Sequence, residues 1–120
     1  MLTVHYYTQY STISSKYREA LVTVDLYINY GNGTVEFHRV SLLNATAFNA
    51  LLEAGAEVEY KVYPGMGVLV TSINGVRNNE TIANHWWLYY VNGALAPVAS
   101  DKYYLSPGDV VTWNYTTSPW

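Results

Sequence analysis

Apolar and polar residues alternate along most of the chain, and this period of two predicts a protein built mainly from β-strands. One face of residues 20–30 (ALVTVDLYINY) is apolar from Val22 to Ile28, while the other face is mostly polar. The turn residues GNG at 31–33 tolerate positive φ, and the alternation resumes in TVEFHRVSLL, residues 34–43. These segments predict an antiparallel hairpin, and we expect its Val22 face to point to the core.

A single segment has the pattern of a helix. In LLNATAFNALLEAG, residues 42–55, either Asn44 or Thr46 can cap the amino end, and Gly55 stands where a left-handed residue ends a helix. The apolar stripe of this segment consists of Phe48, Leu51 and Leu52. A helix this short is marginal by itself, so we expect the stripe to pack on the sheet.

The rest of the chain has strand patterns that are separated by turn signals. Five further strands are predicted at residues 57–63, 67–75, 86–91, 94–98 and 109–117, and the strands at 86–91 and 94–98 form a second hairpin. Residues 76–85 predict a polar loop, and Asn-Gly pairs end two of the strands. This order predicts an α+β fold, in which one helix lies over a mainly antiparallel sheet with an extra small sheet or hairpin. We expect one domain over residues 19–120, preceded by a tether or edge strand at 1–18.

Low charge is the main feature of the composition. Only 12% of the residues are charged, whereas the chain contains 13 tyrosines and has a net charge of -3. Such a chain lacks the basic surface that neutralises phosphates, so we expect neither nucleic acid nor an anionic membrane as a partner. No apolar run reaches the length of a membrane-spanning helix. Cysteine is absent, which excludes disulfides and thiolate chemistry.

Four Asn-X-Ser/Thr sequons are candidate glycosylation sites, and they favour an extracellular or cell-surface location. They lie at Asn32, Asn44, Asn79 and Asn114. The first residues, MLTVHYY, have neither the charged start nor the apolar stretch of a signal peptide. We therefore expect a mature chain or an excised domain.

Residues that usually carry catalysis or bind metals are few and scattered. The three histidines, His5, His38 and His85, match no metal-ligand spacing. Glu57 and Glu59 share one strand face at a separation compatible with glycosidase acids, although such a pair is more often a solvated strand face. Asp101 and Asp109 flank a turn that we expect them to cap, since the oxygen ligands that Ca²⁺ prefers are not clustered there. We expect neither an enzyme, nor a metal site, nor a required cofactor.

The stretch HWWLYYVNG, residues 85–93, places four large rings on one strand. Trp86, Leu88 and Tyr90 fall on one face, and Trp87, Tyr89 and Val91 fall on the other. If only one face is covered by the helix, one set of rings lies in water or against a partner, where it can stack on a sugar or another planar ligand. A second sheet or the N-terminal segment could instead bury both sets, and the sequence leaves both alternatives open.

Three motifs in this order resemble the transcobalamin-like C-terminal domain family, also called the domain of unknown function 4430. They are INGV at 73–76, WLYYVNG at 87–93 and PGDVVTWNY at 107–115. The resemblance covers roughly residues 21–117 and implies a β-grasp-like α+β domain. In vitamin B12 carriers such as intrinsic factor and transcobalamin, the similar domain closes over a corrinoid held by a separate helical barrel. This sequence has no such barrel, so cobalamin is kept only as an alternative ligand.

The resemblance also implies which positions face a ligand. These are Trp87, Tyr89, Ser72 and Asn74, and we add Asn92 as a hydrogen-bonding group. We expect a non-catalytic module that binds a small planar or sugar ligand, or another protein domain, with Trp87→Ala weakening binding and leaving folding nearly intact. A structural or adhesive domain, in which the rings are core, is the alternative. Open strand edges also favour a homodimer as a candidate assembly.

Overall fold

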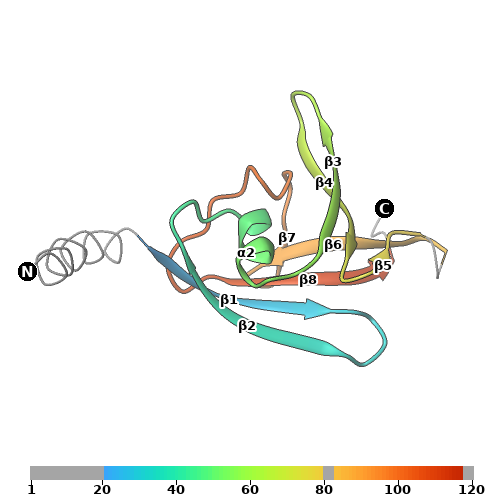
Figure 1. Cartoon of the computed structure of the whole chain (residues 1–120), viewed down its shortest axis with the longest axis horizontal. Helices are drawn as coiled ribbons and strands as arrows, with labels where there is room; N and C mark the ends of the chain where they lie inside the picture. The colour runs from blue at the N-terminus through green and yellow to red at the C-terminus, as the bar shows by residue number, and fades with distance from the viewer. Residues whose placement is uncertain (1–20, 80–82, 118–120) are drawn as a thin grey trace, which may run out of the picture.

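A computed structural model describes residues 21–79 and 83–117, and over these residues it contains one helix and two sheets (Figure 1). The elements are β1 Val22–Asn29, β2 Val35–Leu42, α2 Ala47–Glu53, β3 Val58–Tyr63, β4 Gly67–Ile73, β5 Val76–Arg77, β6 His85–Val91, β7 Ala94–Leu95 and β8 Val110–Thr117. One short helix with mostly strands makes the fold α+β or mainly β, and its β-grasp-like character stays a prediction. The predicted tether at 1–18 lies outside the described residues.

The two sheets have different sizes and meet near β6. The larger sheet has the strand order β2-β1-β8-β6-β7, and the smaller one has the order β3-β4-β5. Neighbouring strands are antiparallel except for β1 and β8, which run parallel in the middle of the larger sheet. Figure 1 shows α2 and the β3–β4 hairpin on the same side of the larger sheet. The sheet is therefore mainly antiparallel, as predicted, and the extra small sheet is present.

The helix is capped where the sequence predicts. The N–H of Asn49 donates to Thr46 Oγ1 at 3.0 Å, and Gly55 has a φ of 84° just after the helix. The buried residues of the helix are Ala47, Phe48, Ala50 and Leu51. The sequence pattern assigns Leu52 to this face, but Leu52 is 45% exposed because it lies outside the helix face that the buried residues form. No helix within the described ranges is long and apolar enough to cross a membrane.

Aromatic side chains from β6 and β8 form much of the core beneath the helix. Trp87 is aligned with Tyr115, and Tyr89 with Trp113. The ring centroids of these pairs lie 5.2 and 5.1 Å apart. Such aromatic pairs contribute about 0.5–1.5 kcal/mol beyond the burial of their surface. The two strands are thus joined by side chains as well as by their backbone ladder, and the inward face of β1, Val24, Leu26 and Ile28, completes this layer as predicted.

The structure decides which face of the aromatic strand is buried. Trp87 and Tyr89 are only 3% and 7% exposed, so the expectation that these two rings form a free stacking surface is wrong. The helix and the smaller sheet cover their face. Both faces of β6 are similarly hydrophobic, so the sequence did not reveal which face would be covered. Trp86 and Tyr90, on the other face, are only partly buried.

The segment after the first Asn-Gly turn also differs from the prediction, because Val76–Arg77 forms β5 where a polar loop is expected. Asn78 follows and joins the two sheets. Its side-chain Nδ2 donates to the carbonyl of Val70 in β4 at 2.9 Å, and its Oδ1 accepts from the N–H of Trp87 in β6 at 2.7 Å. One amide side chain thus satisfies a main-chain group on each of two strand edges.

Replacing Trp87 by alanine should destabilise the domain strongly. Removing a buried Trp side chain costs about 3–5 kcal/mol, and here it also removes the donor of a 2.7 Å hydrogen bond to the Val76 carbonyl. Trp86→Ala is the matched control on the opposite face and should cost about 1 kcal/mol or less. Urea unfolding followed by circular dichroism measures both. Equal losses for the two variants would contradict the assignment of the faces.

Candidate functional site

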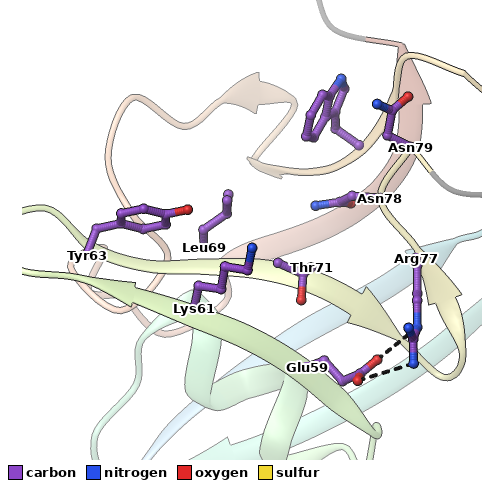
Figure 2. Close-up of a pocket in the computed structure, with 9 residues that line it drawn as sticks. Glu59, Lys61, Tyr63, Leu69, Thr71, Arg77, Asn78 and Asn79 are labelled. Atoms are coloured by element: carbon purple, nitrogen blue, oxygen red, sulfur yellow. Dashed lines mark hydrogen bonds and ion pairs between the residues drawn. The ribbon is translucent and has the colours of Figure 1, made fainter.

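A polar groove lies between the β3–β4 hairpin and the start of β6. Its volume is about 470 Å³. The lining residues on which its chemistry depends are Glu59, Lys61, Tyr63, Leu69, Asn78 and Trp86. Figure 2 shows the side chains of β3 and β4 along its floor, with Asn78 and Asn79 facing them across the groove. The groove therefore combines rings, charges and amides on one surface outside the core.

The alternation of β3 builds one side of the groove. Glu59, Lys61 and Tyr63 are two residues apart, so their side chains lie on the same face of the strand. Tyr63 is 45% exposed, and the Lys61 ammonium forms no ion pair within the described part of the chain. This face offers one ring and one cation to a ligand.

An ion pair closes one end of the groove, as the dashed lines in Figure 2 show. The register places Glu59 opposite Ser72 and Ser72 opposite Arg77, so the side chains of Glu59 and Arg77 meet across β4. The distance from Arg77 Nε to Glu59 Oε2 is 3.3 Å. More than half of each side chain is exposed, so the pair contributes little to stability and can exchange its partners for polar groups of a ligand.

Trp86 supplies the second ring of the groove. Its indole N–H donates to Asn84 Oδ1 at 3.2 Å. Asn84 is itself held by Asn79, whose Oδ1 accepts from the Asn84 N–H, and both asparagines have positive φ. Left-handed conformations of this kind are accessible to asparagine and rare for most other residues. The turn thus fixes the orientation of the Trp86 ring, and the sequence offered a signal for it in the Asn-rich segment 78–84.

The residues that the sequence predicts as ligand-facing are not brought together on one surface. Trp87 and Tyr89 lie in the core, and Ser72 is buried with an Oγ that has no hydrogen-bond partner in the described structure. Asn92 belongs to the β6–β7 turn, where its side chain bonds to Asp109 Oδ1 and to the N–H of Val110, both at 2.9 Å. The role of these residues toward a ligand stays a prediction.

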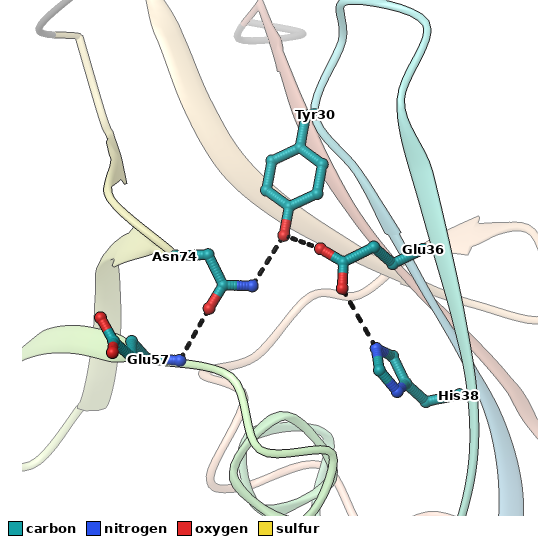
Figure 3. A network of polar contacts seen from close by, with 5 residues as sticks. All are labelled: Tyr30, Glu36, His38, Glu57 and Asn74. Atoms are coloured by element: carbon teal, nitrogen blue, oxygen red, sulfur yellow. Dashed lines mark hydrogen bonds and ion pairs between the residues drawn. The ribbon is translucent and has the colours of Figure 1, made fainter.

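Asn74 lies in a polar network that joins β1, β2 and the β4–β5 turn (Figure 3). The Tyr30 hydroxyl donates to Glu36, and Asn74 Nδ2 donates to the same hydroxyl oxygen at 2.7 Å. Asn74 Oδ1 accepts from the N–H of Glu57 at 2.8 Å, and His38 Nε2 lies 3.3 Å from Glu36 Oε2. The hydrogen bond from Tyr30 lowers the pKa of the Glu36 carboxyl, and burial raises the pKa of the Tyr30 hydroxyl. The network ties the two sheets together.

The other predicted polar residues take structural or exposed positions. Asp109 caps the predicted turn by accepting from the N–H of Ser106 at 2.8 Å, whereas Asp101 accepts from the N–H of Val68 in β4 at 3.0 Å. The described residues include no group of three or more His, Asp or Glu side chains that could hold a metal ion. His38 lies in the network above, the ring of His85 packs 5.4 Å from that of Tyr115, and His5 lies outside the described residues.

The four sequons lie in different surroundings. Asn32 and Asn44 are exposed beside the ends of β2, and Asn79 is exposed in the turn before β6. Asn114 is in the middle of β8, and its Oδ1 is buried without a hydrogen-bond partner in the described structure. The last two residues of the Asn79 sequon lie outside the described residues. Glycosylation stays a prediction, and the side chains of Asn32, Asn44 and Asn79 are more exposed than that of Asn114.

A model of the family described as "Domain of unknown function (DUF4430)" matches residues 44–117. The chain belongs to this family. The resemblance that the motifs indicate is thereby confirmed. No curated protein is significantly similar to the chain in sequence.

Two solved structures share the fold of this DUF4430 domain. A "putative metal binding protein" from Ruminococcus gnavus ATCC 29149 is similar with a TM-score of 0.68 and 15% identity, over 81% of this chain and 98% of that one. Haptocorrin in complex with Cbi is similar with a TM-score of 0.62 and 15% identity, over 79% of this chain. The similar region is only 25% of the haptocorrin chain. At such low identity these likenesses show the fold alone.

Glu36→Gln should reduce the loss of stability at acid pH. The Tyr30 hydrogen bond, and to a smaller extent His38, holds the pKa of Glu36 below its ordinary value of 4.5. A carboxyl with a lower pKa in the folded state stabilises the fold above its unfolded pKa, and this stabilisation is lost as the pH falls through the folded pKa. Because Glu36 is partly exposed, we expect a contribution of less than about 1 kcal/mol.

The measurement is the free energy of unfolding in urea from neutral pH down to below the ordinary pKa of Glu36. Glu53→Gln, which removes an exposed carboxyl at the end of α2, is the control for the loss of one negative charge. An identical acid slope for Glu36→Gln and the unchanged protein would show that the Tyr30 hydrogen bond does not affect the titration of Glu36.

Proposed function

We propose that this DUF4430 domain is a non-catalytic binding module whose ligand occupies the groove between β3–β4 and β6. The observation that carries the proposal is the placement of Trp86 and Tyr63 in one groove with polar side chains. Ligand sites typically combine a few convergent polar groups with aromatic walls. The ring that a ligand would contact is then Trp86, the sequence neighbour of the predicted Trp87.

The chemistry of the groove favours a sugar or another flat ligand with hydroxyl groups. Aromatic faces stack on the apolar face of a planar or sugar ring. Asn78 and Asn79 offer amides, Lys61 offers a cationic donor, and the exposed Glu59–Arg77 pair offers both an acceptor and a donor. A strongly anionic ligand is less suitable because the chain is net negative.

A corrinoid is the second candidate, because the haptocorrin structure that shares this fold is a complex with Cbi. This chain corresponds to a quarter of the haptocorrin chain, so an isolated domain would supply only part of the contacts and would bind weakly. The sequons further support an extracellular or cell-surface role. The alternative is a structural module whose groove binds nothing.

Trp86→Ala should weaken ligand binding by about tenfold or more, because truncating a central Trp of a binding site often costs 2 kcal/mol or more. Calorimetric titration with a panel of oligosaccharides and cobalamin is the measurement, since the loss of a tryptophan would confuse a fluorescence signal. Tyr63→Ala should weaken binding as well.

Tyr27→Ala is the matched control, because Tyr27 is also partly exposed but lies on β1, away from the groove. It should bind like the unchanged protein. Amide chemical-shift mapping with the same panel locates any binding. Absence of shifts at Lys61, Asn78 and Trp86 for every compound, or equal affinity of Trp86→Ala, would count against the groove as the site.

A further inference from the structure

The outer edge of the larger sheet is formed by β2, a long and regular strand. All eight residues of β2 pair with β1 without a register shift. No strand within the described residues pairs with the other side of β2. The opposite edge strand, β7, has only two residues and is soon followed by Pro97. Short edges, bulges and proline protect sheets against pairing with other chains, and β2 has none of these features.

The hydrogen-bond pattern shows which backbone groups of β2 face outward. The N–H of Tyr30 donates to the carbonyl of Thr34 at 3.0 Å, so the even-numbered residues of β2 bond to β1. Adjacent residues of a strand direct their N–H and C=O groups to opposite sides. The N–H and C=O groups of Val35, Phe37 and Arg39 therefore point to the open edge, where another strand could receive them.

The side chains beside this edge are apolar and exposed. Val35 is 53% exposed and Phe37 is 49% exposed. The ring of Phe37 lies 5.0 Å from that of Tyr27, and the guanidinium of Arg39 lies 5.9 Å above it. Exposed apolar side chains on a regular, unpaired strand are typical of a surface that another chain covers.

We propose that β2 pairs antiparallel with β2 of a second copy of this chain, about a two-fold axis at Phe37. The outward-facing backbone groups are on odd-numbered residues, so the odd-numbered residues of one copy must pair with the odd-numbered residues of the other. An axis at Glu36 or at Arg39 would oppose two like charges. An axis at His38 would place Phe37 opposite Arg39, and an axis at Val35 or Val40 would leave Phe37 without an aromatic partner. The axis at Phe37 opposes Phe37 to Phe37 and Glu36 to His38 of the second copy, so it pairs two aromatic rings and opposes no like charges.

The aromatic and polar side chains of β2 together favour a second copy in this register. Glu36 and His38 already lie 3.3 Å apart within one chain, and pairing would place a second hydrogen-bonding side chain opposite each of them across the axis. On the other face, the Tyr27–Phe37 rings of both copies would form one continuous aromatic row. The groove is formed by β3 to β6, and β1 and β8 separate β6 from β2, so two grooves would remain open in the dimer.

Cysteine variants test the register directly, because the chain has no cysteine of its own. In the proposed dimer the two Cα atoms at position 37 would be about 5.5 Å apart, which is within disulfide range. Phe37→Cys should therefore form an intermolecular disulfide under mild oxidation. His38→Cys and Arg39→Cys should do so much more slowly, because in this register neither residue lies opposite itself.

Analytical ultracentrifugation without ligand tests the assembly itself, so its result is independent of the proposed binding function. The unchanged protein should show a concentration-dependent dimer. Phe37→Glu should raise the dimer dissociation constant by about tenfold or more, since it opposes two carboxylates at the axis. Val62→Glu, at an exposed apolar residue of β3 in the smaller sheet, is the control and should have little effect, and circular dichroism checks that both variants fold.

A monomer at all concentrations would overturn the proposal, as would a dimer that persists in Phe37→Glu. Faster disulfide formation at position 38 or 39 than at position 37 would exclude the proposed register.

Discussion

The domain depends on four aromatic side chains that stand together on the inner face of β6 and β8. Each of them is buried and also carries one polar atom, which donates to a main-chain carbonyl of another element. The pairs are Trp87 to Val76, Tyr115 to Arg77, Tyr89 to Val98 and Trp113 to Ala47. Burial raises the pKa of the Tyr89 phenol, which keeps it a neutral donor. These rings thus hold the smaller sheet, the β7–β8 connection and the helix against one pair of strands.

The position of the groove follows from this core. Trp87 and Tyr115 fix β5 through its two carbonyls, and Asn78 then links the edges of β4 and β6. Adjacent residues of a strand point to opposite faces, so Trp86 points outward because Trp87 points inward. The core and the candidate binding surface are therefore built by neighbouring residues of the same strand, which explains why substitutions at 86 and 87 should have such different effects.

Two surfaces of the larger sheet carry different chemistry. The side near β6 meets the smaller sheet and presents a groove with polar groups, whereas the β2 edge presents exposed apolar side chains and unpaired backbone groups. Because β1 and β8 separate these surfaces, a ligand and a second copy of the chain could be bound at the same time. Two grooves in one dimer would raise the avidity for a ligand with repeated units.

The sequence by itself determined the strands, the helix and most of the turns. Period-two alternation, the Thr46 cap and the left-handed Gly55 are local properties, so they can be read from neighbouring residues. The motifs were also sufficient to identify the family. Prediction from local sequence patterns nevertheless failed where a tertiary contact decides the secondary structure. An example is β5, whose two residues form a strand because β4 and the aromatic rings provide their partners.

Only the tertiary structure decided which rings are core. Both faces of β6 are aromatic, so no property of the strand distinguishes Trp86 from Trp87, and the choice depends on which face the helix and the smaller sheet cover. The same is true of the groove, whose lining comes from four strands that only the fold brings together. The parallel pairing of β1 with β8 joins opposite ends of the described chain. Contacts between residues so distant in sequence leave no periodic signal, and therefore the site could not be predicted from the sequence.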